Sequence, residues 1–211
     1  LEKASGRDLD QWGRLWLETA GVNTLKPELS VGGDGTISSF AILQSATEAQ
    51  PTLRPHRLAV GFYNLNGAGK LERVHREELD VDGARTDVPA LAGLAQPDLI
   101  LLNDDDLAYA KVRLDPKSLA TATAHLKDFS QSLPRTLVWG SAWDAARDGE
   151  TPARGYVELI LANIAEDQHQ RVSEQQLVEL FAIVQVSQQH ALDDPAQQRA
   201  RKRRAECGEP E

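Results

Sequence analysis

Three adjacent carboxylates, Asp104, Asp105 and Asp106, are the residues of this sequence that most readily suggest chemistry. Such a group could bind a metal ion or serve in acid–base catalysis. A calcium loop, however, places its oxygen ligands at alternate positions, with glycine at the sixth and glutamate at the twelfth. Here the sixth position holds no glycine and the twelfth is Asp115. Because neighbouring side chains on extended backbone point in opposite directions, and because aspartate favours turns, the sequence predicts a turn between two strands.

The segment NLNGAGKLE (64–72) shares part of the phosphate-loop pattern. That pattern needs a glycine five residues before its Gly-Lys pair and a serine or threonine directly after it. Asn64 and Leu71 stand at those two positions, and the residues after Lys70 are strand-like. We therefore interpret this segment as a hairpin turn.

The histidines and the single cysteine do not form a recognisable site. No two histidines have metal-ligand spacing on a helix. The segment HREEL (75–79) lacks the second histidine of the zinc-peptidase pattern, so we expect His75 on the solvated side of a strand. Cys207 alone excludes an internal disulfide and a cysteine-based zinc site, and no G-x-S-x-G motif occurs. We predict no catalytic, cofactor-binding or metal-binding residue in this chain. The histidines considered are His56, His75, His125, His169 and His190.

The composition argues against two classes of partner. The 211 residues carry a net charge of −9, from 23 basic and 32 acidic side chains, whereas a protein that neutralises phosphates needs excess Lys and Arg. We expect no nucleic-acid partner, although the basic run RARKRR (199–204) leaves that alternative open. No apolar run reaches the roughly 18 residues of a membrane span, and the charged N-terminus is unlike a secretory signal. We expect no membrane partner and a cytoplasmic location.

The absence of methionine is a further feature of the composition. A complete translated protein normally begins with one. We therefore interpret the chain as a piece of something longer.

An N-terminal helix is predicted from apolar residues that recur at helical spacing. Ser5 with Asp8 resembles a capping box, and Gly21 is typical of the residue after a helix end. A helix of this length cannot bury both Trp12 and Trp16 by itself. We expect it to pack on a neighbouring domain.

Residues 23–115 change to a period of two, which is typical of strands. Strands are predicted over residues 36–46, 57–65, 70–81, 98–103 and 106–114, and Asp82-Gly83 is predicted to form a hairpin. Several short strands with turn signals between them indicate a β-sandwich.

Residues 116–192 return to helical spacing. Helices are predicted from Pro116, from Ser132 as a cap, from Thr151-Pro152 and from Ser173. The short link between the second and third predicts a helical hairpin, and two hairpins in series suggest the start of an α-solenoid. The fold class is thus α+β, with a short helix, a β-sandwich and α-helical hairpins.

Two smaller features complete the C-terminal part of the sequence. Trp139 and Trp143, four residues apart, are predicted to pack in a core or a helix–helix contact. The tail, residues 193–211, has no apolar periodicity and is predicted to be disordered.

Three segments together resemble the aminopeptidase N family of zinc metallopeptidases, in their order as well as their residues. They are SGRDLDQWGRLWLETAGVNTLKPEL (5–29), LILLNDDDLAYAKVRLD (99–115) and SLPRTLVWGSAWDAARDGETPARGYVELIL (132–161). In that family a catalytic domain ends in a helix, and a small β-sandwich and a large helical domain follow. The family's H-E-x-x-H helix, G-A-M-E-N-like motif and oxyanion tyrosine have no counterpart here, so no catalytic residue carries over.

The resemblance implies a domain organisation and partners. Residues 1–22 would be the terminal helix of the preceding catalytic domain, 23–115 the sandwich, 116–192 part of the helical domain and 193–211 the tail. The partners would be the catalytic domain of the same polypeptide and, for the intact zinc enzyme, peptides whose N-terminal residues it releases. This chain, inactive alone, would enclose the active-site chamber and bind no zinc itself. The alternative is a free-standing protein-binding or scaffold module without enzymatic activity.

Overall fold

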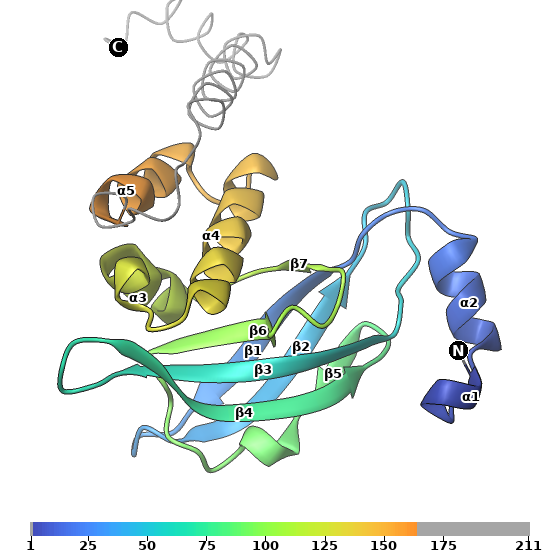
Figure 1. Cartoon of the computed structure of the whole chain (residues 1–211), viewed down its shortest axis with the longest axis horizontal. Helices are drawn as coiled ribbons and strands as arrows, with labels where there is room; N and C mark the ends of the chain where they lie inside the picture. The colour runs from blue at the N-terminus through green and yellow to red at the C-terminus, as the bar shows by residue number, and fades with distance from the viewer. Residues whose placement is uncertain (1, 164–211) are drawn as a thin grey trace, which may run out of the picture. The chain divides into compact units, whose positions relative to one another are not determined.

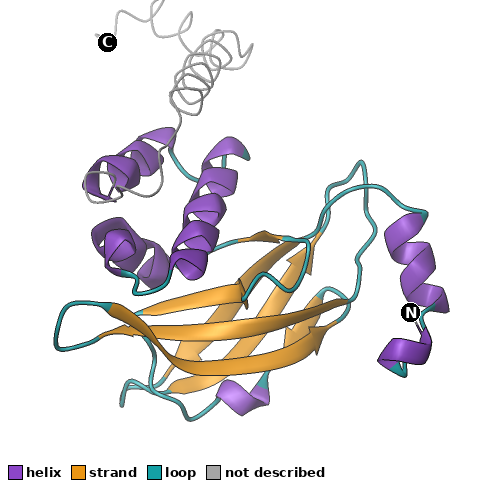
Figure 2. Ribbon diagram, in the orientation of Figure 1, coloured by secondary structure: helices purple, strands orange, loops and turns teal. Residues whose placement is uncertain are grey.

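The computed structural model describes residues 2–163, with side chains for all of these except residues 4 and 5. These residues belong to one compact unit, Leu1–Glu166. Two short helices come first, seven strands follow, and three helices end the described part of the chain (Figures 1 and 2). This order confirms the predicted α+β class.

Two sheets make up the strand region. The first has the order β5-β2-β1-β7 and the second the order β4-β3-β6. All neighbouring strands are antiparallel except β1 and β7, which are parallel. The strands are β1 (Thr24–Val31), β2 (Ile37–Ser45), β3 (His56–Leu65), β4 (Leu71–Val81), β5 (Arg85–Asp87), β6 (Leu99–Asp104) and β7 (Lys111–Val112).

The hydrophobic core is built from side chains of both sheets. Leu25 and Ile42 come from the first sheet, and Leu58, Val60 and Ile100 from the second; each is at most 2% exposed. Burying such a side chain contributes roughly 1.5–3 kcal/mol. The predicted strands over 36–46, 57–65 and 98–103 are thus present, and their apolar residues form the predicted sandwich core.

The N-terminal helix differs from its prediction. The chain forms α1 (Glu2–Ser5) and then α2 (Asp10–Leu17), and the residue before α2, Leu9, offers no side-chain cap. The predicted Ser5–Asp8 capping box is therefore wrong. Gly21 has the predicted left-handed backbone, with φ of 99°, but it lies beyond the cap of α2 at Glu18.

Two strand predictions also need correction. Of the strand predicted over 106–114, only the two residues of β7 form, because the turn after β6 continues through Asp106 in left-handed backbone. The turn at Asp82-Gly83 exists, but it does not close a hairpin. It joins β4 of one sheet to β5 of the other, and the short 3₁₀ helix Pro89–Leu91 follows.

The three later helices are α3 (Pro116–His125), α4 (Ser132–Arg147) and α5 (Ala153–Asn163), with a 3₁₀ turn, Leu126–Asp128, after α3. Asp115 caps α3 by accepting hydrogen bonds from the backbone N–H groups of Lys117 and Ser118. Ser132 was predicted as a cap, but it is the first residue of α4 and the preceding Gln131 makes no side-chain cap bond.

The predicted contact between the second and third helices is present. The rings of Trp143 on α4 and Tyr156 on α5 lie 5.3 Å apart, as expected for a tryptophan in a helix–helix contact. Within residues 2–163 no helix is long and apolar enough to cross a membrane. The helix predicted from Ser173 and the tail over 193–211 lie outside the described residues.

Candidate functional site

The three adjacent aspartates, Asp104 to Asp106, lie at the end of β6 and in the turn that follows it. Asn103, Asp105 and Asp106 have φ of 56°, 69° and 56°, and the Asp106 backbone N–H donates to the Asn103 carbonyl at 3.0 Å. The Asn103 side-chain amide also donates to the carbonyl of Ala108 (2.7 Å) and accepts from its N–H (2.8 Å). The turn predicted between two strands is confirmed, although the second strand begins later than expected.

Asp104 is a buried carboxylate with two side-chain partners. It is 1% exposed, and its oxygens accept from the Tyr63 hydroxyl and from Arg73 Nη1, both at 2.8 Å. Burial and the bond to Asp104 raise the pKa of Tyr63, so the hydroxyl remains a proton donor. A Cβ at Gly61 would collide with the carboxylate. A larger residue at position 61 would push the Asp104 carboxylate away from Tyr63 and Arg73. Glycine is therefore required there, because a buried carboxylate is stable only when it is paired.

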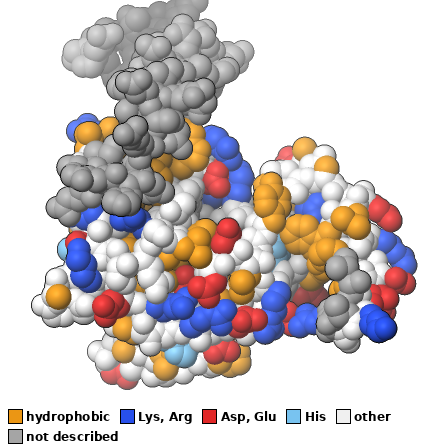
Figure 3. Space-filling view, viewed as in Figure 1, with side chains coloured by type: hydrophobic (Ala, Val, Ile, Leu, Met, Phe, Trp, Pro, Cys, Tyr) orange, Lys and Arg blue, Asp and Glu red, His pale blue; other side chains and the backbone are white. Residues whose placement is uncertain are grey.

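Asp105 extends this cluster to the surface. It accepts from Arg73 Nη1 (2.8 Å) and from Arg76 Nε (2.7 Å), and these bonds lower the pKa of Asp105. Figure 3 shows basic and acidic side chains side by side over β3 and β4, where the arginines lie. Guanidinium groups lie against the carboxylates of Asp104 and Asp105, so these two aspartates anchor the end of β6 to β4.

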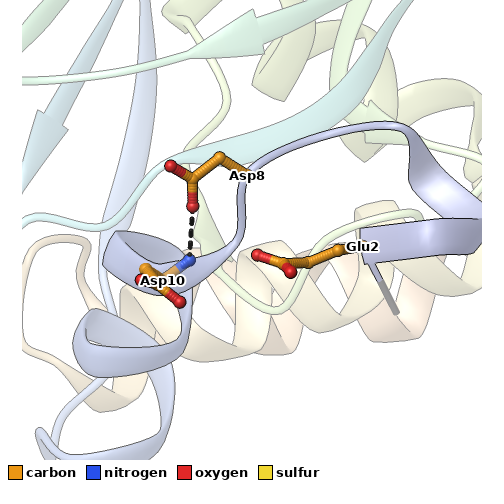
Figure 4. Close-up of side chains that lie close together, drawn as sticks. All are labelled: Glu2, Asp8 and Asp10. Carbon is orange, nitrogen blue, oxygen red and sulfur yellow. Dashed lines mark hydrogen bonds between the residues drawn. The ribbon is translucent and has the colours of Figure 1, made fainter.

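A second acidic group lies at the N-terminal helices. Single carboxylate oxygens of Glu2, Asp8 and Asp10, all exposed, lie within 4.8 Å of one another (Figure 4). Two of the carboxylates accept backbone bonds at the start of α2: Glu2 Oε1 from Leu9 N–H (2.9 Å) and Asp8 Oδ1 from Asp10 N–H (3.0 Å). Carboxylates are stabilised at this end of a helix by its dipole. Two of the three carboxylates, those of Glu2 and Asp8, are thus accounted for as hydrogen-bond acceptors at the start of α2.

The described histidines do not converge on one site. His125 is half-buried and bonded to Asp128 at 3.1 Å. His75 was predicted on the solvated side of a strand, which is wrong. It is half-buried against Phe62, with ring centroids 5.7 Å apart. His56 is 4% exposed. His169 and His190 lie outside the described residues.

Arg54 fastens the end of α2 to the sandwich. Its side chain donates to the carbonyls of Leu15 (2.9 Å) and Ala20 (2.8 Å) and to the Thr19 hydroxyl (2.6 Å). These carbonyls belong to the last turn of α2 and the residues after it, where a cation is favoured by the helix dipole. Arg54 is itself 2% exposed, so this contact is part of the interior.

Trp16 covers the same junction. Its indole N–H donates to the Pro55 carbonyl (3.2 Å), and its ring lies 5.4 Å from the Arg54 guanidinium carbon and 5.3 Å from the His56 ring. Trp16 of the predicted helix thus packs on the sandwich, within the same compact unit. On its other side, His56 Nε2 lies 2.8 Å from Gln44 Oε1.

We predict that His56 makes the stability of this unit depend on pH. Burial, and then the charge of Arg54, lower the pKa of His56 from 6.5 to about 4. Well above pH 6.5 the residue is neutral in both the folded and the unfolded chain. As the pH falls from 6.5 to 4, the unfolded chain binds a proton that the folded chain does not, so stability is lost. The free energy of unfolding should fall by about 2 kcal/mol more in wild type than in His56→Gln between pH 7.5 and 5. Urea titrations at the two pH values measure this difference; equal losses would contradict the assignment.

A second set of charged groups, centred on the buried Arg113, joins the sandwich to the helices. Arg113, directly after β7, has a side chain that is 6% exposed. It donates to both carboxylate oxygens of Glu150 (2.9 and 2.7 Å) and to Asp148 (2.6 Å). Lys111 also donates to Asp148, at 2.8 Å. Asp148 and Glu150 lie between α4 and α5, so this pairing fixes the helical hairpin on the strand that precedes it.

Neutral hydrogen bonds continue the same junction. The Ser141 hydroxyl of α4 donates to the Val112 carbonyl at 2.7 Å, and the Ile100 N–H donates to the Ser118 hydroxyl of α3 at 2.8 Å. Ser118 and Ser141 are buried. Buried polar contacts of this kind require one mutual orientation of the elements that they join.

Two comparisons with known proteins indicate the family of this chain. The family model for the ERAP1-like C-terminal domain matches residues 99–206. Aminopeptidase N of Streptomyces lividans is 57% identical over 173 residues, which are 79% of this chain and 20% of that relative. The chain thus spans about a fifth of the relative's length. It belongs to the aminopeptidase N family, and its residues 99–206 match the ERAP1-like C-terminal domain.

Proposed function

We propose that this chain is a non-catalytic C-terminal portion of a zinc-dependent aminopeptidase N. In the intact protein it supports the catalytic domain and encloses the chamber in which N-terminal residues are released from peptides. The domain organisation that we propose is a terminal helix (1–22), a sandwich (23–115), part of the helical domain (116–192) and a tail (193–211). The observation that carries the proposal is the apolar surface of α2, which is fixed on the sandwich but only half covered.

The exposed part of α2 is suited to contact with the preceding portion of the polypeptide. Trp12 is 36% exposed and Leu17 is 78% exposed, and the Trp12 ring lies 6.2 Å from that of the docked Trp16. Hydrophobic side chains gather on the side of the molecule where α2 lies (Figure 3). Tryptophan is prominent among the residues that dominate binding energy at interfaces. The relative's remaining four fifths supply a partner for this surface.

The rigid junctions support the proposed enclosing role. Arg54 holds α2 on the sandwich, and Arg113 holds the α4–α5 connection on β7. A wall of a reaction chamber must keep a fixed position relative to the catalytic groups, because small displacements are costly in rate. Two buried arginines, Arg54 between β2 and β3 and Arg113 directly after β7, meet that requirement.

The zinc of the family does not fit the residues described here. In the described part of the chain, three potential metal-ligating groups come together only at Glu2, Asp8 and Asp10. That donor set has neither histidine nor cysteine, whereas zinc sites in proteins rely on nitrogen and sulfur ligands. We therefore assign the zinc chemistry to the portion of the polypeptide that precedes this chain.

The proposal is tested with the preceding portion of the polypeptide produced separately. We expect it to bind this chain, and Trp12→Ala to weaken that binding by roughly tenfold or more, as for a central interface tryptophan. Gln11→Ala, an exposed polar position on the same helix, is the matched control and should change binding less than twofold. Isothermal titration calorimetry measures both. Equal affinities for Trp12→Ala and wild type would rule out the α2 surface as the contact.

A further inference from the structure

We infer that the loop Asp105–Ala110 is a second contact surface for the preceding portion of the polypeptide, made by Leu107 and Tyr109. The inference rests on the proposed function and adds a site to it. Leu107 is 47% exposed and Tyr109 is 74% exposed. The two residues lie between β6 and β7, well separated in sequence from α2.

The backbone of this loop is held in a costly conformation. Asn103, Asp105 and Asp106 are all left-handed, although none is glycine. A left-handed L-residue costs roughly 1–2 kcal/mol, with Asn and Asp the most tolerant types. Backbone of this kind is retained where the surrounding structure enforces it, commonly at binding sites.

Three features below the loop enforce its shape. The Asn103 amide bonds both backbone groups of Ala108. Asp104 is buried with Tyr63 and Arg73, which fixes the start of the turn. Ala108 and Ala110 pack against the sandwich core.

Successive side chains of this loop therefore alternate between the sandwich and the solvent. The alanines at 108 and 110 are partly buried, whereas Leu107 and Tyr109 are exposed. Tyrosine is enriched at protein interfaces because its ring offers a large apolar area with a polar end. A loop already fixed in one conformation loses little entropy when it binds. Neither Leu107 nor Tyr109 belongs to the hydrophobic core.

The size of this surface favours a partner in the same polypeptide over a second copy of the chain. A specific dimer buries roughly 800 Å² per partner, far more than two side chains provide. A covalently linked partner acts at an effective concentration near millimolar, so a small contact is sufficient. The relative of this chain has about four fifths of its length outside the matched region, and that portion is the occupant that we assign.

The test compares two surfaces in the same binding experiment. We expect Leu107→Ala/Tyr109→Ala to weaken binding of the separately produced preceding portion by about 10–100-fold, as for interface anchors. Val74→Ala removes an exposed apolar side chain from β4 (58% exposed) and should have less than a twofold effect. All variants should keep the wild-type unfolding temperature. If the double variant binds like wild type while Trp12→Ala does not, the loop inference fails and the proposed function stands. If wild type does not bind at all, both fail.

A second measurement uses the full-length protein and does not depend on reassembly. A photo-crosslinking amino acid replaces Tyr109, and the crosslinked peptides are identified by mass spectrometry. We expect an intramolecular crosslink to a residue that precedes Leu1 of this chain. Crosslinks confined to a second copy of the protein, or to residues of the sandwich itself, would overturn the inference.

Discussion

Replacing Asp104 by alanine is expected to lower the free energy of unfolding by about 3–5 kcal/mol, the loss typical of a buried ion pair from which one partner is removed. The substitution leaves the Tyr63 hydroxyl and one Arg73 bond without their acceptor in a site that is 1% exposed. It also frees the end of β6, which lies between the sandwich core and the turn. Chemical denaturation followed by circular dichroism measures the change.

Asp105→Asn is the control, since Asp105 binds the same Arg73 from the surface and asparagine tolerates the left-handed backbone at this position (φ of 69°). Its side chain is 35% exposed, and exposed ion pairs contribute roughly 0–1 kcal/mol. We expect a loss of no more than about 1 kcal/mol. Similar losses for the two variants would show that the burial of Asp104 does not matter and would contradict the structural role given to the cluster.

Replacing Arg113 by alanine is expected to lower the free energy of unfolding by about 3 kcal/mol, since hydrogen bonds to charged groups contribute about 1.5–3 kcal/mol each and do not add fully. The side chain is 6% exposed, so its bonds to Asp148 and Glu150 are shielded from water on the arginine side. Both carboxylates are partly exposed and can be hydrated after the change, which keeps the loss below that expected for Asp104→Ala.

The position of the helices should change together with stability in this variant. Hydrogen exchange of α4 and α5 is expected to become faster in Arg113→Ala, because the α4–α5 connection loses its attachment to β7. Arg154→Ala is the control, since Arg154 pairs with Glu158 within α5 at 89% exposure. Arg154→Ala should leave exchange and stability nearly unchanged. Unchanged exchange of α4 in Arg113→Ala would contradict the role of Arg113 as the fixing residue.

The sequence was informative where local chemistry decides the structure. The continuous apolar run at 98–103 predicts a buried strand, and all residues of β6 are buried. The turn at 103–106 follows from the tolerance of Asn and Asp for left-handed backbone. Segment 132–161, together with two others, indicated the family that the comparisons then showed.

Other features depend on residues that are far apart in the sequence. Asp104 is a charged residue beside a turn and suggests a solvent-exposed position, but Tyr63 and Arg73, more than 30 residues earlier, pair with it in the interior. The turn at Asp82-Gly83 has the local signature of a hairpin, whereas sheet pairing sends β5 to the other sheet. Arg113 carries no local signal for its partners at 148 and 150.

The α2 junction was predictable only in part. The spacing of Trp12 and Trp16 indicates a helix that must pack on something. The spacing cannot indicate that Arg54 donates to the carbonyls at the end of this helix. Arg54 is more than 30 residues away in the sequence, and only the fold brings it to the helix. A buried arginine beside two buried polar residues, Asn23 and His56, is a feature that only the structure reveals.

The central claim is that this chain serves a reaction whose catalytic groups lie in another part of the polypeptide. The most direct measurement is turnover of an aminoacyl chromogenic substrate, with zinc ions present, by the pure chain, by the separately produced preceding portion and by their mixture. We expect no turnover by this chain alone, and more turnover by the mixture than by the preceding portion alone. Turnover by the pure chain that a zinc chelator abolishes, or a mixture no more active than the preceding portion, would contradict the account.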